Sequence, residues 1–124
     1  MANDTGIVER LASLKVIAKM RGDAQASSFA GEMGALANSN VFQSLWGRPG
    51  LDAKSRSLVT LGILIALRAH DELRVHIPLA VANGCTVAEV EEVIYHASGY
   101  AGFPAANSAR VTAIEALRGE GLIA

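Results

Sequence analysis

Hydrophobic positions along this chain recur at intervals of three and four residues, and they do not alternate with polar positions for long. That periodicity is typical of α-helices and disfavours β-strands. Glycine and proline interrupt the pattern at a few points, where short loops are expected. The sequence therefore predicts an all-α domain of about six helices, which cover approximately residues 5–20, 24–45, 53–69, 71–83, 87–100 and 104–118.

Several of these helices carry recognisable start and stop residues. Asp4 or Thr5 is suited to be the N-cap of the first helix, and Asp52 that of the third. Thr86 with Glu89 forms the pattern of a capping box. Gly84 is expected just after the end of a helix, and Pro104 at the first position of the last one. None of the three prolines interrupts an obvious helical pattern. The helix over residues 53–69 is apolar on nearly every side, so we expect it to be buried.

Length and composition indicate that the chain has enough apolar residues for a hydrophobic core, and more than one such core requires. It has 124 residues, the size of one domain, and we treat residues 1–124 as a single unit. Hydrophobic residues make up 51% and charged residues only 19%. An apolar surplus in a short helical chain is often buried between subunits, so a homo-oligomer is expected.

The charge and apolar patterns exclude several classes of protein. The net charge is −1 and Lys and Arg are not clustered, which argues against nucleic-acid binding. The longest apolar run, Leu58 to Ala69, is too short to cross a membrane. The N-terminal residues do not resemble a signal peptide, so a cytoplasmic protein is expected. The chain has a single cysteine, Cys85, which excludes a disulfide framework and a CxxC pair within one chain. Cys85 is expected to be a small buried residue, and a reactive thiol is the alternative.

Two pairs of residues could carry acid–base chemistry. Glu72 and His76 are four residues apart in a helical pattern, and so are His96 and Tyr100 on the next expected helix. Because the two helices are consecutive, the two pairs could converge on one site. A carboxylate one turn from an imidazole can accept its N–H and raise its pKa, which prepares a general acid or base. The alternative is an ordinary exposed pair. His96 is expected to be either a buried histidine or, with Tyr100, a polar group that lines a pocket.

The remaining candidates are an arginine and a possible metal site. Arg56 lies in the first turn of an apolar helix, where a cation is unfavourable and needs a partner: a carboxylate, a second subunit or an anionic ligand. No two of the three histidines have the spacing of helical metal ligands, so no metal site is indicated. Trp46, in the break Trp46 to Gly50, is expected to be a packing anchor.

Two long segments identify a family resemblance. They are GRPGLDAKSRSLVTLGILIAL and ELRVHIPLAVANGCTVAEVEEVIYHASGYAGFPAAN. With them, the chain from about Phe42 to Leu117 resembles the carboxymuconolactone decarboxylase family, within a wider group of peroxidase-like (AhpD-like) proteins. The order and spacing of the pieces match throughout.

The resemblance implies an all-α fold whose subunits assemble as a ring-like hexamer, or as a trimer. It also implies decarboxylation with no cofactor and no metal, and it marks His76 as the family's histidine with Glu72 one turn before it. The thiol peroxidase branch carries a CxxC pair just before this histidine. Here Ala69 and Glu72 stand at those positions, and Cys85 lies after the helix, so disulfide-based peroxide reduction is not supported.

The expected activity is decarboxylation of a small organic acid, for example 4-carboxymuconolactone in the catabolism of aromatic compounds by the beta-ketoadipate pathway. In this hypothesis Arg56 holds the substrate carboxylates, and His96 or Tyr100 stabilises the dienolate oxygen. His76, supported by Glu72, protonates the ring carbon.

Two alternatives remain open at the level of sequence. The chain could be a non-catalytic oligomeric protein that binds a ligand on the same fold. It could also retain thiol peroxidase-like activity through Cys85.

Overall fold

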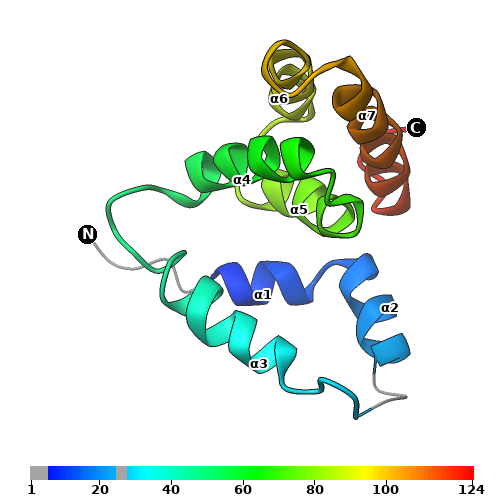
Figure 1. The fold of residues 1–124 in the computed structure, drawn as a ribbon. Coiled ribbons are helices and arrows are strands. Elements are labelled where there is room, and N and C mark those ends of the chain that lie inside the picture. Colours follow the sequence, from blue (N-terminus) through cyan, green and yellow to red (C-terminus); the bar gives the residue numbers. More distant parts are fainter. Residues whose placement is uncertain (1–5, 25–27) are drawn as a thin grey trace.

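The computed structural model describes residues 6–24 and 28–124, and every regular element in these residues is helical (Figure 1). This confirms the predicted all-α fold. The helices are α1 (Ile7–Ala12), α2 (Lys15–Ala24), α3 (Met33–Ala37), η1 (Asn38–Gln43), α4 (Ala53–Leu67), α5 (His70–Ala82), α6 (Val87–Tyr100) and α7 (Phe103–Gly119).

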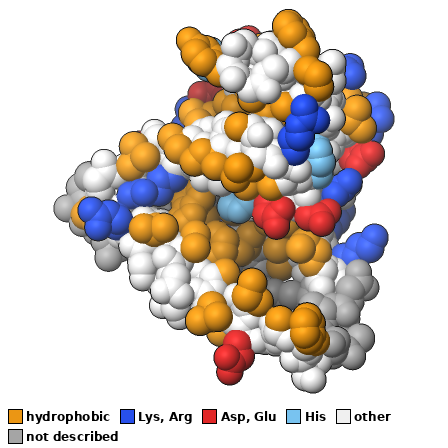
Figure 2. Space-filling model, in the orientation of Figure 1, with side chains coloured by type: hydrophobic (Ala, Val, Ile, Leu, Met, Phe, Trp, Pro, Cys, Tyr) orange, Lys and Arg blue, Asp and Glu red, His pale blue; other side chains and the backbone are white. Residues whose placement is uncertain are grey.

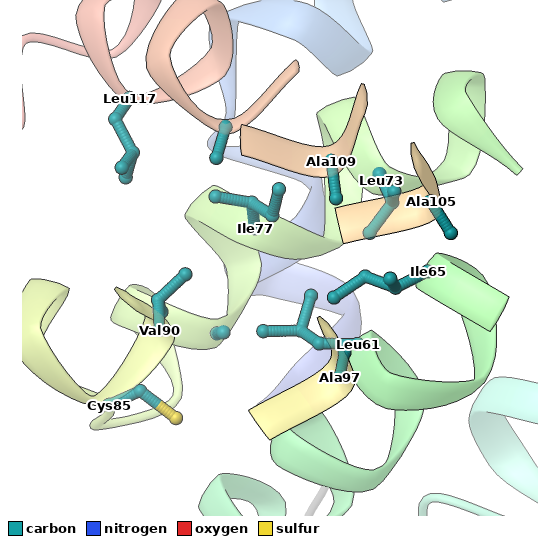
Figure 3. Close-up of a cluster of buried hydrophobic side chains, with 12 residues drawn as sticks. Leu61, Ile65, Leu73, Ile77, Cys85, Val90, Ala97, Ala105, Ala109 and Leu117 are labelled. Carbon is teal, nitrogen blue, oxygen red and sulfur yellow. The ribbon is translucent and has the colours of Figure 1, made fainter. Parts of the chain in front are cut away.

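Helices α4 to α7 enclose the larger of two hydrophobic clusters. Helix α5 packs against both α4 and α7, and α6 packs against α4 and α7. Figure 3 shows Leu61 and Ile65 of α4 and Ile77 of α5 converging on the same space, and all three are 1% exposed. Burying side chains of this size contributes about 1.5–3 kcal/mol each to the free energy of folding.

The N-terminal helices form a second layer against α5. In Figure 1, α1 and α3 lie below α4 and α5. A smaller hydrophobic cluster joins the two layers; its buried members are Ile7, Leu11, Leu14, Trp46, Val75 and Leu79. The π-helix η1 leads from α3 toward Trp46, so it brings residues of the N-terminal layer close to α5.

The predicted capping residues are confirmed. The carboxylate of Asp52 accepts a hydrogen bond of 2.7 Å from the backbone N–H of Ser55. Thr86 and Glu89 form the expected capping box at the start of α6. Gly84 follows α5 with a φ of +106°, a conformation that favours glycine. These local signals explain why the helices after residue 52 begin and end close to their predicted positions.

The predicted boundaries are wrong in the N-terminal half. The helix expected over residues 5–20 is divided into α1 and α2 near Ser13, and the start expected for it, Asp4 or Thr5, lies outside the described residues. The helix expected over residues 24–45 begins only at Met33 and widens into η1. In η1 the hydroxyl of Ser44 donates to the carbonyl of Ser39 at 2.7 Å, and such side-chain bonds to the backbone compete with regular helical pairing.

Two further expectations about helix interiors are corrected. Pro78 lies inside α5. It has no N–H to donate to the preceding turn, and it is buried in the packed interior, which stabilises the helix around it. Helix α4 is buried on one side only, because Val59, Ile63 and Leu67 are each more than half exposed in the single chain.

No helix among the described residues is both long enough and apolar enough to cross a membrane.

Candidate functional site

His76 lies on the side of α5 that faces the N-terminal layer. Its neighbours on the helix, Val75 and Leu79, belong to the cluster that joins the two layers. Figure 2 shows a hollow between these layers that is surrounded mainly by hydrophobic side chains, with Lys or Arg side chains toward one end and Asp or Glu side chains toward the other. His76 as a whole residue is half-buried, so it is not fully closed off from the solvent.

Two aromatic rings flank the imidazole of His76. Phe42 of η1 lies with its ring centroid 6.3 Å from the imidazole, and the planes are 14° apart. Trp46 lies at 6.2 Å with an angle of 22°. Phe42 and Trp46 are themselves 6.4 Å apart, so the three rings form a compact triangle. The sequence predicts a packing role for Trp46 and no role for Phe42. Their spacing of four residues is the signal that could have placed both rings on one helical face.

The electrostatic environment of His76 differs from the one expected. Burial lowers the pKa of His76 below its ordinary value, and the charge of Glu72 opposes that shift without reversing it. Glu72 is exposed, and the described contacts include no hydrogen bond between its carboxylate and the imidazole. The Nδ1 atom of His76 is buried and has no hydrogen-bond partner. The expected net increase in pKa is therefore wrong, because desolvation outweighs the attraction of an exposed carboxylate.

Arg56 finds its partners in the loop before α4. Its Nε donates to the carbonyl of Leu51 and its Nη2 to the carbonyl of Arg48, each at 2.9 Å. The unfavourable position of this cation at a helix N-terminus is thus compensated by backbone oxygens. No carboxylate is paired with Arg56 in the described residues, and its remaining N–H groups are available for another acceptor.

His96 and Tyr100 line a different groove. Their rings lie 5.1 Å apart on α6, and both side chains are exposed. With Val59, Gly62 and Ile63 of α4 they border an open, mostly apolar groove of about 930 Å³. His76 is not among the residues that line this groove, so the two acid–base pairs do not share a pocket in the described part of the chain. Of the two expectations for His96, the pocket-lining one fits this position.

The other reactive side chains have structural surroundings. Cys85 is 3% exposed, and burial raises the pKa of its thiol above the ordinary value. A buried thiol that stays protonated is a poor nucleophile. His70 begins α5, with its Nδ1 3.4 Å from the hydroxyl of Thr112. In residues 6–24 and 28–124, His, Cys, Asp and Glu side chains form no group of three that could hold a metal ion.

Comparison with known sequences connects this chain to a family. Residues 32–115, about two thirds of the chain, match the Carboxymuconolactone decarboxylase family. This segment includes Phe42, Trp46, Arg56, Glu72 and His76.

Individual relatives cover part of the chain. A 4-carboxymuconolactone decarboxylase of Acinetobacter baylyi is 46% identical over 78 residues, which are 63% of this chain and 58% of the relative. The nitrosuccinic acid decarboxylase npaB of Metarhizium robertsii is 44% identical over 68 residues, 55% of this chain and 48% of the relative. An uncharacterized 15.0 kDa protein of Paracoccus denitrificans is 37% identical over 70 residues, 55% of this chain and 52% of the relative. The chain therefore spans about half the length of the curated relatives it matches.

Proposed function

The chain belongs to the carboxymuconolactone decarboxylase family, and on that premise we propose that it removes a carboxylate from a small organic acid. The observation that carries the proposal is that two relatives more than 40% identical in this region are both named decarboxylases, although of different acids. Their names point to a shared reaction more than to a shared substrate.

The two acids have a chemical feature in common. In each, the bond to a carboxylate lies near a group that can accept an electron pair: an unsaturated lactone carbonyl in one and a nitro group in the other. When the carbon–carbon bond breaks, CO2 leaves and its bonding electrons delocalise to give a dienolate or a nitronate. A proton then adds to the carbon and completes the reaction. We propose a substrate of this class, with 4-carboxymuconolactone as the first candidate.

In this proposal His76 supplies the proton. Its imidazole is neutral near pH 7 in the unliganded protein, because burial lowers its pKa. An anionic substrate would raise that pKa again and offer a partner for a ring nitrogen, so the acid form arises in the complex. The hydrophobic surroundings of the hollow favour loss of CO2, since a carboxylate is destabilised where water is scarce. Glu72 assists by its charge.

Arg56 is proposed to hold a second carboxylate of the substrate through the N–H groups that the loop carbonyls do not use. His96 and Tyr100 were expected to stabilise the developing oxygen anion. Since they line a different groove in one chain, that role requires a second subunit to bring them to the substrate.

A homo-oligomer is also part of the proposal. Val59, Ile63 and Leu67 project at four-residue spacing from the outer face of α4, and each is more than half exposed. Gly62 and Ala66 on the same helix line the groove and leave room for a close approach. An apolar helix face beside an apolar groove is suited to bury a second copy. The expected hexamer or trimer stays a prediction.

The test is direct. Purified protein is mixed with 4-carboxymuconolactone and, separately, with nitrosuccinic acid, while CO2 release and ultraviolet absorbance are followed. We expect CO2 from at least one acid, and loss of that activity in His76→Gln. A raised melting temperature without CO2 would contradict the proposal and favour the non-catalytic ligand-binding alternative. Peroxide reduction that depends on Cys85 would favour the thiol alternative, which the burial of that thiol disfavours.

A further inference from the structure

Histidines that act in catalysis are usually oriented by a hydrogen bond. One ring nitrogen binds a carboxylate or a backbone carbonyl, and this bond fixes both the tautomer and the direction of the other nitrogen. In this chain Nδ1 of His76 is buried and has no such partner. Glu72, one turn earlier, makes no hydrogen bond with the ring. Another element must therefore hold the imidazole.

The aromatic triangle provides that element. Phe42 and Trp46 both lie within the range of favourable aromatic contact with His76, at nearly parallel angles. Trp46 is only 6% exposed and is fixed by the cluster that joins the two layers, so its indole is a rigid surface. Phe42 is half-buried and packs against the same cluster.

The local backbone explains how two residues of one segment reach the same imidazole. The carbonyl of Val41 accepts hydrogen bonds from the N–H of Leu45 at 2.9 Å and from the N–H of Trp46 at 3.0 Å. The second bond spans five residues, which is the π-helical pattern, and such wide turns are frequent at functional sites. The turn leaves Phe42 and Trp46 on one side, toward α5.

We propose that Trp46, supported by Phe42, is the positioning residue of this site: its indole holds the His76 imidazole in one orientation and keeps water from one face of the ring, in place of the usual hydrogen bond. Only the expected effect of Trp46 on catalysis rests on the proposed function. The orientation of the ring can be measured without any substrate.

The charged groups around His76 do not provide an alternative explanation. Glu72 on α5 acts on the pKa of His76 only through its charge. Arg10 on α1 is bonded to the amide oxygen of Asn83, and the exposed Arg48 belongs to the loop after Trp46. Neither arginine contributes to the shift at His76. Burial is the largest influence on the pKa of this imidazole, and Phe42 and Trp46 are the two rings that flank it.

The experiment is an NMR titration of the three histidines in the full-length protein labelled with nitrogen-15. Wild type is compared with Trp46→Phe and Trp46→Leu, and with Leu45→Ala as a matched control, because Leu45 is the exposed neighbour of Trp46. We expect Trp46→Leu to raise the pKa of His76 toward its ordinary value and to replace one dominant tautomer by a mixture. Trp46→Phe should preserve most of both properties, and Leu45→Ala all of them.

His70 and His96 serve as internal references. If their signals are unchanged, the fold is intact in the variant. If Trp46→Leu does not fold, Phe42→Leu carries the test and should change His76 in the same direction by a smaller amount. An unchanged pKa and tautomer of His76 in a folded Trp46→Leu or Phe42→Leu variant would overturn the proposal.

Activity measurements separate this inference from the proposed function. On an acid that the wild type decarboxylates, Trp46→Leu should lower kcat on the order of 10- to 100-fold while KM changes little, because a displaced proton donor affects the chemical step more than binding. Trp46→Phe should restore most of kcat. A wild type with no decarboxylase activity would refute the proposed function while the NMR result still decides whether Trp46 positions the ring.

Discussion

Glu72 lies one helical turn before His76 and acts on it through charge alone, with no hydrogen bond between the carboxylate and the imidazole. Because Glu72 is exposed, water screens this interaction and keeps it weaker than the effect of burial. The two residues therefore form a weakly coupled pair of neighbours and not a hydrogen-bonded acid–base pair. The charge of Glu72 raises the pKa of His76 to some extent, but burial lowers it by more, so the net shift is downward.

This relationship predicts unequal effects of two substitutions. His76→Gln should lower kcat by about 10²- to 10⁴-fold, the usual contribution of a general acid. Glu72→Gln should lower it by less than about tenfold, because only a screened charge is lost. It should also move the pH optimum of kcat/KM to lower pH, since His76 loses the charge that raises its pKa. Steady-state kinetics across pH are the measurement, with Glu91→Gln on α6 as the control; equal losses in both variants would show that Glu72 acts directly.

The pKa of His76 also predicts how stability depends on pH. Its pKa in the folded protein is lower than in the unfolded chain, so the unfolded chain binds more protons below about pH 6.5. The stability that His76 contributes is therefore fully present above that pH and is lost as the pH falls toward the folded-state pKa. Asp52 and Glu89 also have lowered pKa values, but carboxyl groups titrate in a more acidic range, near pH 4.

Denaturant unfolding between pH 7 and pH 5 tests this prediction. The wild type should lose stability over this interval, and His76→Gln should lose clearly less. His96→Gln is the matched control, because His96 is exposed. A His76→Gln variant with the same slope as the wild type would mean that another group binds the proton.

The fold was predictable from sequence where local signals agree. Asp52 and the pair Thr86 and Glu89 mark helix starts with side chains that satisfy backbone N–H groups, and Gly84 allows the chain to leave α5. The break between α1 and α2 and the wide turn of η1 have no comparable signal. They depend on how the N-terminal layer packs against α5, which local propensity does not encode.

The site was predictable only in part for a similar reason. The spacing of Glu72 and His76 made the histidine a candidate, because residues four apart along a helix lie on the same face. The contact of His76 with Phe42 and Trp46 joins segments about thirty residues apart and depends on tertiary packing. The expected convergence of His76 with His96 failed because spacing along each helix says nothing about how α5 and α6 are rotated relative to one another.

A polar network between the two layers predicts a specific loss of stability. The amide of Asn83 donates to the buried hydroxyl of Ser57 at 2.9 Å, and its oxygen accepts from Arg10. Asn83→Leu removes the partner of a hydroxyl that is 1% exposed, so it should cost about 1–3 kcal/mol. Ser57→Ala in that background should recover part of the loss. Chemical denaturation of the two single variants and the double variant gives the coupling, and strictly additive effects would contradict the network.

The environment of Cys85 predicts an inert thiol. Its side chain lies in the larger core, and its pKa is raised, so little thiolate forms near neutral pH. A disulfide reagent should therefore modify native protein far more slowly than protein unfolded in denaturant. Cys85→Ala should keep the proposed decarboxylase activity and lose only a modest amount of stability. Rapid modification of the native thiol, or loss of activity in Cys85→Ala, would show that Cys85 takes part in the chemistry.

The last prediction concerns the outer face of α4 and the groove beside it. Arg68 follows the C-terminus of α4. Glu92 of α6 lines the groove and comes three residues after Glu89, which pairs at 2.9 Å with Lys54 near the start of α4. Neither Arg68 nor Glu92 has an ion-pair partner in the described part of the chain. Two copies that pack α4 against α4 in antiparallel orientation would bring Arg68 of each copy toward Glu92 of the other, while Val59, Ile63 and Leu67 are covered.

Arg68→Glu should then weaken association by at least about tenfold, because two like charges face each other. Glu92→Arg should do the same, and the double exchange Arg68→Glu with Glu92→Arg should restore association. Ile63→Asp should abolish it by placing a charge in the apolar contact. Arg110→Glu and Val111→Asp on α7 make the same changes at exposed positions away from this groove and serve as controls. Light scattering and sedimentation measure the mass; a monomeric wild type, or a double exchange as weak as the single variants, would exclude this packing.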